Sequence, residues 1–114
     1  ADAIVRKMKD AEVIAFATPI YFYEMCGQMK TLLDRSNPLF PSDYAFRDIY
    51  LLATAADSAE SSMDGAVKGL GGWIACFEKA ALRGVVRGTG ADGAGTILQV
   101  PAALKSAFEL GNKA

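Results

Sequence analysis

The residues of this chain that are best suited to bind a ligand follow a short apolar run. Residues 13–17 are apolar and partly β-branched, which is typical of a strand buried on both faces of a sheet. Thr18-Pro19 is predicted to end this strand, because proline has no N–H for a central ladder. Three consecutive aromatic residues follow at 21–23. Ligands of open parallel sheets bind just beyond the carboxyl ends of strands, so we expect a site in the loop 18–24.

Beyond the aromatic loop, apolar residues recur at helical spacing. Met25, Met29, Leu32 and Leu33 are separated mainly by polar residues, which is typical of an amphipathic helix. A buried strand, a loop and an amphipathic helix together form half of a βαβ unit. The segment therefore predicts an α/β fold with a parallel sheet.

Three motifs stand at fixed spacing in this segment. They are Thr18-Pro19-Ile20-Tyr21, Gly27-Gln28-Met29-Lys30 and Asp34-Arg35. Together they resemble the NAD(P)H-dependent FMN reductase and iron–sulfur-flavoprotein-like branch of the flavodoxin superfamily. Members of that branch carry S/T-P-x-Y, then Q-[LM]-K after a small residue, and D-R at the helix end. The downstream order of elements also fits, so the resemblance covers nearly all 114 residues and corresponds to the C-terminal portion of the family's domain.

The resemblance implies one flavodoxin-like domain over residues 1–114, with three α/β/α layers and a parallel sheet of order 2-1-3-4-5. The apolar runs 13–17, 49–55 and 84–87 would be its strands 3, 4 and 5. Strands 1 and 2 have no counterpart, so we expect a truncated domain without the N-terminal phosphate-binding loop and with weak retention of FMN. The strand at 13–17 would then have a bare apolar edge, which favours a homo-oligomer, either a dimer or a tetramer.

The remaining patterns complete the alternation of strands and helices. Helices are predicted around residues 4–8, over residues 63–81 and from Pro101 to just before Gly111, the expected residue after the helix. The loop 88–95 contains a G-x-G-x-x-G pattern, but residues 96–100 have an extended pattern where a dinucleotide fingerprint needs a helix. This loop is therefore predicted to rim the same end of the sheet.

The segment 36–48 is rich in turn-forming residues and is predicted to be a loop. It carries four large apolar side chains, Leu39, Phe40, Tyr44 and Phe46. These side chains would either cover the edge of the sheet or form the wall of a substrate pocket or a subunit contact.

The long helical pattern at 63–81 contains residues with two possible roles. Trp73 and Cys76 are predicted to be core residues rather than site residues. Gly69, Gly71 and Gly72 each lower helix stability relative to alanine, so their presence indicates close packing or a kink near Trp73.

Binding of a flavin ring requires backbone N–H groups near its pyrimidine edge and an aromatic side chain against its face. A proline-fixed loop after a buried strand can supply both, and the resemblance adds the loop 55–58 after the second strand. The predicted cofactor-binding residues are Thr18, Pro19, Ile20, Tyr21, Phe22, Tyr23, Ala55, Ala56, Asp57 and Ser58. The alternative role for residues 21–23 is that of a hydrophobic plug or an interface patch.

Composition excludes several classes of function. The chain has no histidine, which excludes Ser–His and Cys–His catalysis and histidine-ligated metal centres. The net charge of −1 without a basic cluster argues against nucleic acid, and no apolar run approaches the length of a membrane span. The two cysteines are far apart and form no metal motif, which fits a reducing compartment and a cytoplasmic protein.

The resemblance implies an FMN-dependent NAD(P)H oxidoreductase of the flavin or quinone reductase type. Hydride would pass from the nicotinamide to bound FMN and then to a small-molecule electron acceptor, without a catalytic side chain or a metal. Cys26, at the start of a helix where a thiolate is favoured, is predicted to be a small structural residue rather than a catalytic thiol. The alternative function is a non-catalytic, oligomerising remnant or binding module of the same fold.

Overall fold

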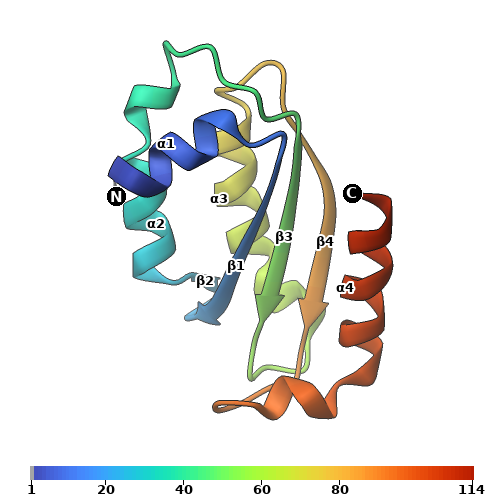
Figure 1. Cartoon of the computed structure of the whole chain (residues 1–114). Helices are drawn as coiled ribbons and strands as arrows, with labels where there is room; N and C mark the ends of the chain where they lie inside the picture. The colour runs from blue at the N-terminus through green and yellow to red at the C-terminus, as the bar shows by residue number, and fades with distance from the viewer. Residues whose placement is uncertain (1) are drawn as a thin grey trace.

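The sheet consists of three parallel strands and one short antiparallel strand. The computed structural model describes residues 2–114, and its sheet has the order β2-β1-β3-β4 (Figure 1). Strands β1 (Val13–Tyr21), β3 (Asp48–Thr54) and β4 (Ala81–Gly88) are parallel, as the sequence predicts. The sheet is nevertheless mixed rather than purely parallel, because the chain turns back after β1 and adds β2 (Glu24–Met25) antiparallel to its end.

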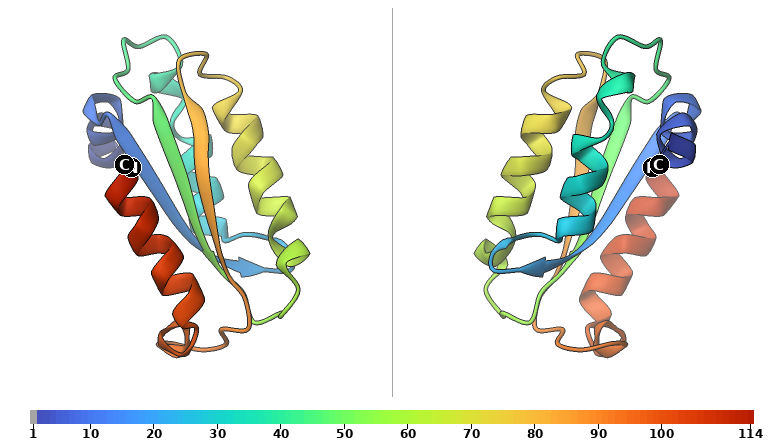
Figure 2. Two further views of the ribbon diagram at one scale, coloured as in Figure 1. Left: turned by 90° about the vertical axis from the view of Figure 1, so that its right-hand side faces the viewer. Right: turned by 90° about the vertical axis from the view of Figure 1, so that its left-hand side faces the viewer.

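Helices cover both faces of this sheet. The helices are α1 (Asp2–Asp10), α2 (Gly27–Asp34), α3 (Asp64–Ile74) and α4 (Pro101–Lys113). Figure 2 shows α2 and α3 on one face and α4 on the other, which gives the three layers expected from the resemblance. Three 3₁₀ turns complete the chain, η1 (Asn37–Leu39), η2 (Glu60–Met63) and η3 (Thr96–Gln99). Among the described residues, no helix has the length and apolar character needed to cross a membrane.

Strand β1 differs from its prediction in burial and in length. Its residues alternate between buried and exposed, so only the face with Ile14 and Phe16 is covered, and Ala15 and Ala17 on the other face remain exposed. The reason is that α4 packs along β4 and leaves this part of the sheet open. The strand also continues through Pro19 to Tyr21, because proline is tolerated where a strand has an open edge.

The boundaries after β3 also differ from the sequence-based expectation. Helix α3 ends at Ile74 instead of Ala81, because two short-range bonds, from Cys76 N–H to the Trp73 carbonyl and from Phe77 N–H to the Ile74 carbonyl, close the chain into a turn. Strand β4 begins at Ala81.

Three smaller predictions near the C-terminal half are wrong. Residues 96–99 form η3 rather than an extended segment, and Gly111 lies inside α4 rather than after it. Cys76 is exposed, because the early end of α3 carries it out of the buried face.

The core lies mainly between the sheet and the α2–α3 layer. Phe46 and Leu39 are buried almost completely, and Tyr44 stacks on Phe46 with ring centroids 4.5 Å apart. Trp73 packs against Phe46 and donates its indole N–H to the Ser36 hydroxyl at 2.8 Å. The apolar side chains of the loop 36–48 therefore build the core, and Phe40 alone among them is exposed.

Candidate functional site

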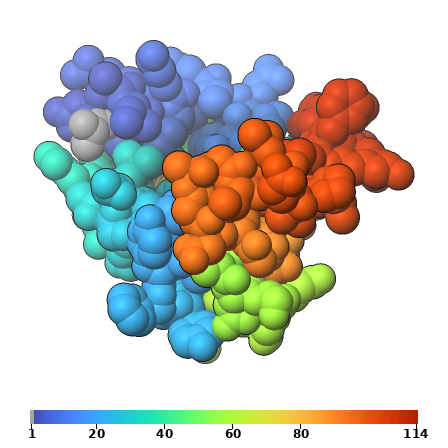
Figure 3. Space-filling model, turned by 90° about the horizontal axis from the view of Figure 1, so that it is seen from below, coloured from blue at the N-terminus to red at the C-terminus, as the bar shows by residue number. Residues whose placement is uncertain are grey.

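The carboxyl ends of the three parallel strands meet at one end of the molecule, where two adjoining cavities open. Figure 3 views this end, with the turn after β1 in light blue, the loop after β3 in green and the loop after β4 in orange. The larger cavity, of about 460 Å³, is lined by Pro19, Ile20, Tyr21, Thr54, Ala55, Ala56, Ala91, Asp92, Gly93 and Ala94. The smaller cavity, of about 250 Å³, is lined by Ile20, Phe22, Tyr23, Ala55, Ala56, Asp57 and Ser62. Because the two cavities share Ile20, Ala55 and Ala56, we treat them as one site.

The turn between β1 and β2 displays its aromatic side chains under backbone strain. Tyr21 pairs with Glu24, so Phe22 and Tyr23 form a two-residue hairpin turn, and both have positive φ angles, 51° and 66°. Glycine or asparagine is the usual choice in such a turn, and another residue there costs on the order of 1 kcal/mol. Phe22 is 98% exposed and Tyr23 64% exposed, so burial does not compensate for this strain. Strain that packing does not explain is a feature of ligand sites.

Two contacts hold the aromatic turn in place. The Thr18 hydroxyl donates to the Pro19 carbonyl at 2.7 Å and accepts from the Cys26 N–H at 3.0 Å, which ties the end of β1 to the start of α2. Gly65, in the first turn of α3, lies directly under the turn, and a Cβ there would overlap the Tyr23 carbonyl oxygen. The position of the turn thus depends on the buried hydroxyl of Thr18 and on the lack of a side chain at Gly65.

The loop after β3 presents unused backbone donors to the site. Two of its carbonyls are occupied, since the Ala55 oxygen accepts from Ala91 N–H and the Asp57 oxygen accepts from Gly90 N–H. The Asp57 carboxylate accepts from the Ala59 N–H at 2.8 Å and so stabilises the turn. In the part of the chain that the structure describes, the N–H groups of residues 56–58 have no acceptor. These groups can therefore bind carbonyl or anionic oxygens of a ligand.

Most of the predicted site residues come together at this end of the sheet. Eight of them line one or both cavities, namely Pro19, Ile20, Tyr21, Phe22, Tyr23, Ala55, Ala56 and Asp57. Thr18 does not face these cavities, since its hydroxyl is engaged in the internal contacts, and Ser58 is exposed outside both.

Sequence reasoning placed the loop 88–95 at the rim of the site but missed one buried residue. Residues 91–94 of that loop line the larger cavity, as the expected position of the loop implies. Ser62 lines the smaller cavity, and the sequence contained no sign that it is buried, since it stands in a polar stretch with Ser61.

Cys26 lies beside the site rather than in it. Burial raises the pKa of its thiol, but the neighbouring Thr18 side chain and the backbone at Met29 and Gln28 outweigh this, so the pKa lies below its usual value of 9.0. Cys26 lines neither of the two cavities at the carboxyl ends of the strands. The geometry is consistent with a structural residue at the start of α2.

Replacing Cys26 with alanine is expected to reduce stability in a pH-dependent way. Because the folded-state pKa is below 9.0, the thiolate stabilises the fold above that pH, and this stabilisation is lost as the pH falls through the folded-state pKa. The difference in free energy of unfolding between the natural protein and Cys26→Ala should grow as the pH rises towards 9, as measured by urea unfolding. The same difference at every pH would contradict this expectation.

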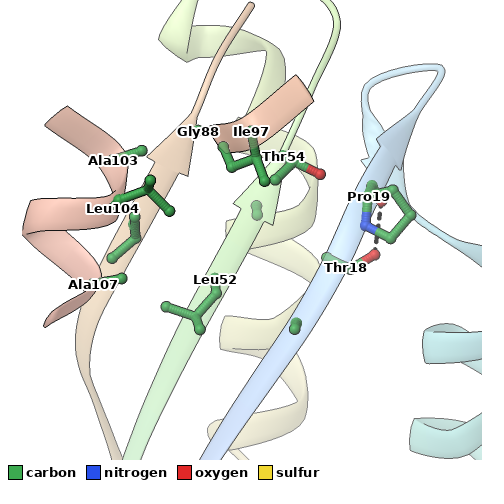
Figure 4. A pocket seen from close by; sticks show the side chains of 12 residues that line it. Thr18, Pro19, Leu52, Thr54, Gly88, Ile97, Ala103, Leu104 and Ala107 are labelled. Carbon is green, nitrogen blue, oxygen red and sulfur yellow. Dashed lines mark hydrogen bonds between the residues drawn. The ribbon is translucent and has the colours of Figure 1, made fainter. Parts of the chain in front are cut away.

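A third cavity, of about 360 Å³, lies between α4 and the open face of the sheet. Figure 4 shows Leu104, Ala103 and Ala107 of α4 on one side of it and Leu52 of β3 beneath. It is almost entirely apolar, and its lining residues include no titratable side chain. The described residues also contain no group of three or more potential metal ligands. The two cavities at the carboxyl ends of the strands, by contrast, are lined by aromatic side chains together with Asp57 or Asp92.

Comparison with known proteins identifies a shared fold. A solved structure, the Trp repressor binding protein from Bacillus subtilis, matches 93% of this chain and 72% of its own, with a TM-score of 0.76 and 23% identity. That likeness shows a shared α/β fold of the flavodoxin-like type.

Two curated proteins show sequence similarity. The chain is 47% identical over 38 residues to an iron–sulfur flavoprotein of Methanocaldococcus jannaschii, a match that covers 33% of this chain and 20% of that protein. It is 29% identical over 65 residues to a Bacillus subtilis protein proposed to be an NAD(P)H-dependent FMN-containing oxidoreductase, covering 50% of this chain and 36% of that protein. The chain thus matches well under half the length of either relative.

The family assignment rests on a longer match. Residues 1–87 fit the family model described as NADPH-dependent FMN reductase. This segment of the chain includes β1, β3, most of β4 and the aromatic turn. FMN with NAD(P)H is the cofactor pair of that family and of the Bacillus subtilis relative. With its α/β fold and the match over three quarters of its length, the chain belongs to the NADPH-dependent FMN reductase family.

Proposed function

We propose that this chain binds the isoalloxazine ring of FMN in the two adjoining cavities and acts in an NAD(P)H-dependent flavin oxidoreductase. The observation that carries the proposal is the strained aromatic turn, which faces free backbone N–H groups across these cavities. A planar ring with an apolar body and a carbonyl-bearing edge fits both features. The electron acceptor is proposed to be a small molecule, a flavin or a quinone.

The chemical groups at this site match those of the FMN ring. The N–H groups of Ala56 and Asp57 would hold carbonyl oxygens of the ring edge, and the aromatic side chains of the turn would lie against the ring. When bound, FMN supplies the redox chemistry by accepting hydride from NAD(P)H. Hydride transfer needs no acid–base side chain, so the protein's role is to bind the ring, orient it and exclude water.

Replacing Tyr21 or Phe22 with alanine is expected to weaken FMN binding by about 2- to 10-fold, the range of a single aromatic contact. FMN titration of the protein, followed by quenching of flavin fluorescence, measures the change. Phe40→Ala is a matched control, because Phe40 is also an exposed aromatic residue but lines neither cavity. Unchanged affinity and quenching in both site variants would contradict the proposal.

A second candidate function, a non-catalytic oligomerising module, is favoured by a different observation. Within the described chain, β1 has no partner along its outer edge except at Ile20 and Tyr21. The adjacent face carries exposed Leu104 and Phe108 of α4 as well as Ala15 and Ala17. Open apolar edges of this kind favour pairing with another chain.

The chain is therefore expected to self-associate, as a dimer or tetramer. Light scattering gives the mass, and the visible absorbance of the same sample gives the flavin content. Ala15→Lys, which places a charge beside the open edge, should shift the mass towards the monomer. A monodisperse monomer would contradict the expectation, whatever its flavin content.

A further inference from the structure

Ser62 carries a buried hydroxyl that the protein itself does not use. Its side chain is 3% exposed and lines the smaller cavity, and its Oγ has no hydrogen-bond partner among the described residues. A buried hydroxyl without a partner destabilises a fold, and such groups in natural proteins call for an explanation. Alanine would fit the same position without that penalty.

The surroundings of Ser62 are apolar, and the turn that carries it is held by hydrogen bonds. Ala53, Ala55 and Met63 form a small buried cluster against which Ile20 packs. The η2 turn that carries Ser62 is held by Arg87 of β4, whose guanidinium donates to the Glu60 carbonyl at 2.7 Å and to the Asp64 carboxylate at 2.8 Å. The hydroxyl is therefore a single polar group held in place on an otherwise apolar wall.

The groups on the other side of the same cavity restrict which hydrogen-bonding groups a ligand can carry. Phe22 and Tyr23 lie at the strained turn, and the backbone N–H groups of Ala56 and Asp57 have no acceptor. Backbone N–H groups can only donate, whereas a serine hydroxyl can both donate and accept. A ring edge on which carbonyl oxygens alternate with an N–H group would satisfy all of these groups at once.

We propose that Ser62 is a ligand-binding residue whose hydroxyl hydrogen-bonds the carbonyl- and N–H-bearing edge of a planar heteroaromatic ring. The dioxopyrimidine edge of the flavin is a ligand edge of this chemistry, so the inference rests on the proposed function and deepens it. Ser62 then distinguishes rings with such an edge from purely apolar rings, which the cavity would otherwise accept.

The test compares Ser62→Ala with Ser61→Ala, since Ser61 is the exposed neighbour on the same turn. Without ligand, Ser62→Ala should unfold at a temperature about 2–6 °C higher, because an unpartnered buried hydroxyl is removed. With ligand, its affinity for FMN should fall about 2- to 10-fold, the value of one hydrogen bond. Ser61→Ala should change neither measurement.

Lumiflavin, which has the ring but no ribityl phosphate, serves as a second probe. The loss caused by Ser62→Ala should be the same for lumiflavin and FMN, because the contact is with the ring. A loss for FMN alone would overturn the assignment to the ring edge. Equal FMN binding by Ser62→Ala and the natural protein, or a lower unfolding temperature of the free variant, would overturn the inference and leave the proposed function standing. If the natural protein binds neither probe, the proposed function fails and the inference with it.

Discussion

Replacing Phe22 with asparagine and Tyr23 with glycine is expected to stabilise the protein and at the same time weaken its binding of FMN. Both residues have positive φ angles in a two-residue hairpin turn, and Asn-Gly is the sequence that this turn geometry favours. Relief of about 1 kcal/mol for each residue gives an increase of about 2 kcal/mol in the free energy of unfolding. Little packing is lost, because Phe22 is 98% exposed.

The same double change removes both aromatic rings from the smaller cavity, so FMN affinity should fall at least about tenfold. Urea unfolding without ligand and FMN titration by fluorescence measure the two effects separately. Tyr23→Phe is the control, because it keeps the ring and the strained backbone, and it should change neither quantity appreciably. A double variant that binds FMN normally would show that the strain of the turn serves another purpose, such as an interface between copies.

Gly65→Ala is expected to displace the aromatic turn between β1 and β2. The new Cβ would overlap the Tyr23 carbonyl oxygen, which belongs to backbone and cannot rotate away, so the aromatic turn or the start of α3 must move. Overpacking of this kind costs roughly 1–3 kcal/mol of stability. Displacement of the turn should also weaken FMN binding, since Tyr23 lines the smaller cavity.

Gly72→Ala is the matched control for this change. Gly72 lies in the same helix, and a Cβ there would meet no atom within 4 Å. Alanine should therefore raise the free energy of unfolding by about 1 kcal/mol through helix propensity and leave FMN affinity unchanged. Thermal unfolding and FMN titration of both variants check the pair. A Gly65→Ala protein as stable as Gly72→Ala, with normal FMN affinity, would refute the role assigned to Gly65.

Local sequence signals predicted the type and order of most elements correctly. The apolar runs at 13–17 and 49–55 lie in β1 and β3, and the helical periodicities lie in α1, α2, α3 and α4. These signals are reliable because burial of one face imposes a period on the sequence. The exact ends were less accurate, since they depend on tertiary contacts; α3 ends at Ile74 because the following turn places Phe77 in the aromatic core.

The mixed character of the sheet could not be foreseen from the residues. Phe22 and Tyr23 have no preference for a tight turn, so nothing in the sequence indicated that β2 would fold back on β1. The turn is held by contacts from distant parts of the chain, namely Gly65 under the Tyr23 carbonyl and the bond between the Thr18 hydroxyl and Cys26 N–H. Tertiary contacts thus overrode local propensity at the site itself.

By itself, the sequence of this protein determined its family, its alternation of strands and helices, and the two loops in which a cofactor site was expected. Motif spacing and hydrophobic period are local properties, so they can be read along the chain. Only the tertiary structure decided that the Thr18 hydroxyl is engaged in internal hydrogen bonds, that the buried hydroxyl of Ser62, a residue lining the smaller cavity, has no partner among the described residues, and that two aromatic residues occupy a strained turn. These features depend on contacts at the carboxyl end of the sheet. Such contacts form when segments that lie far apart in sequence pack together.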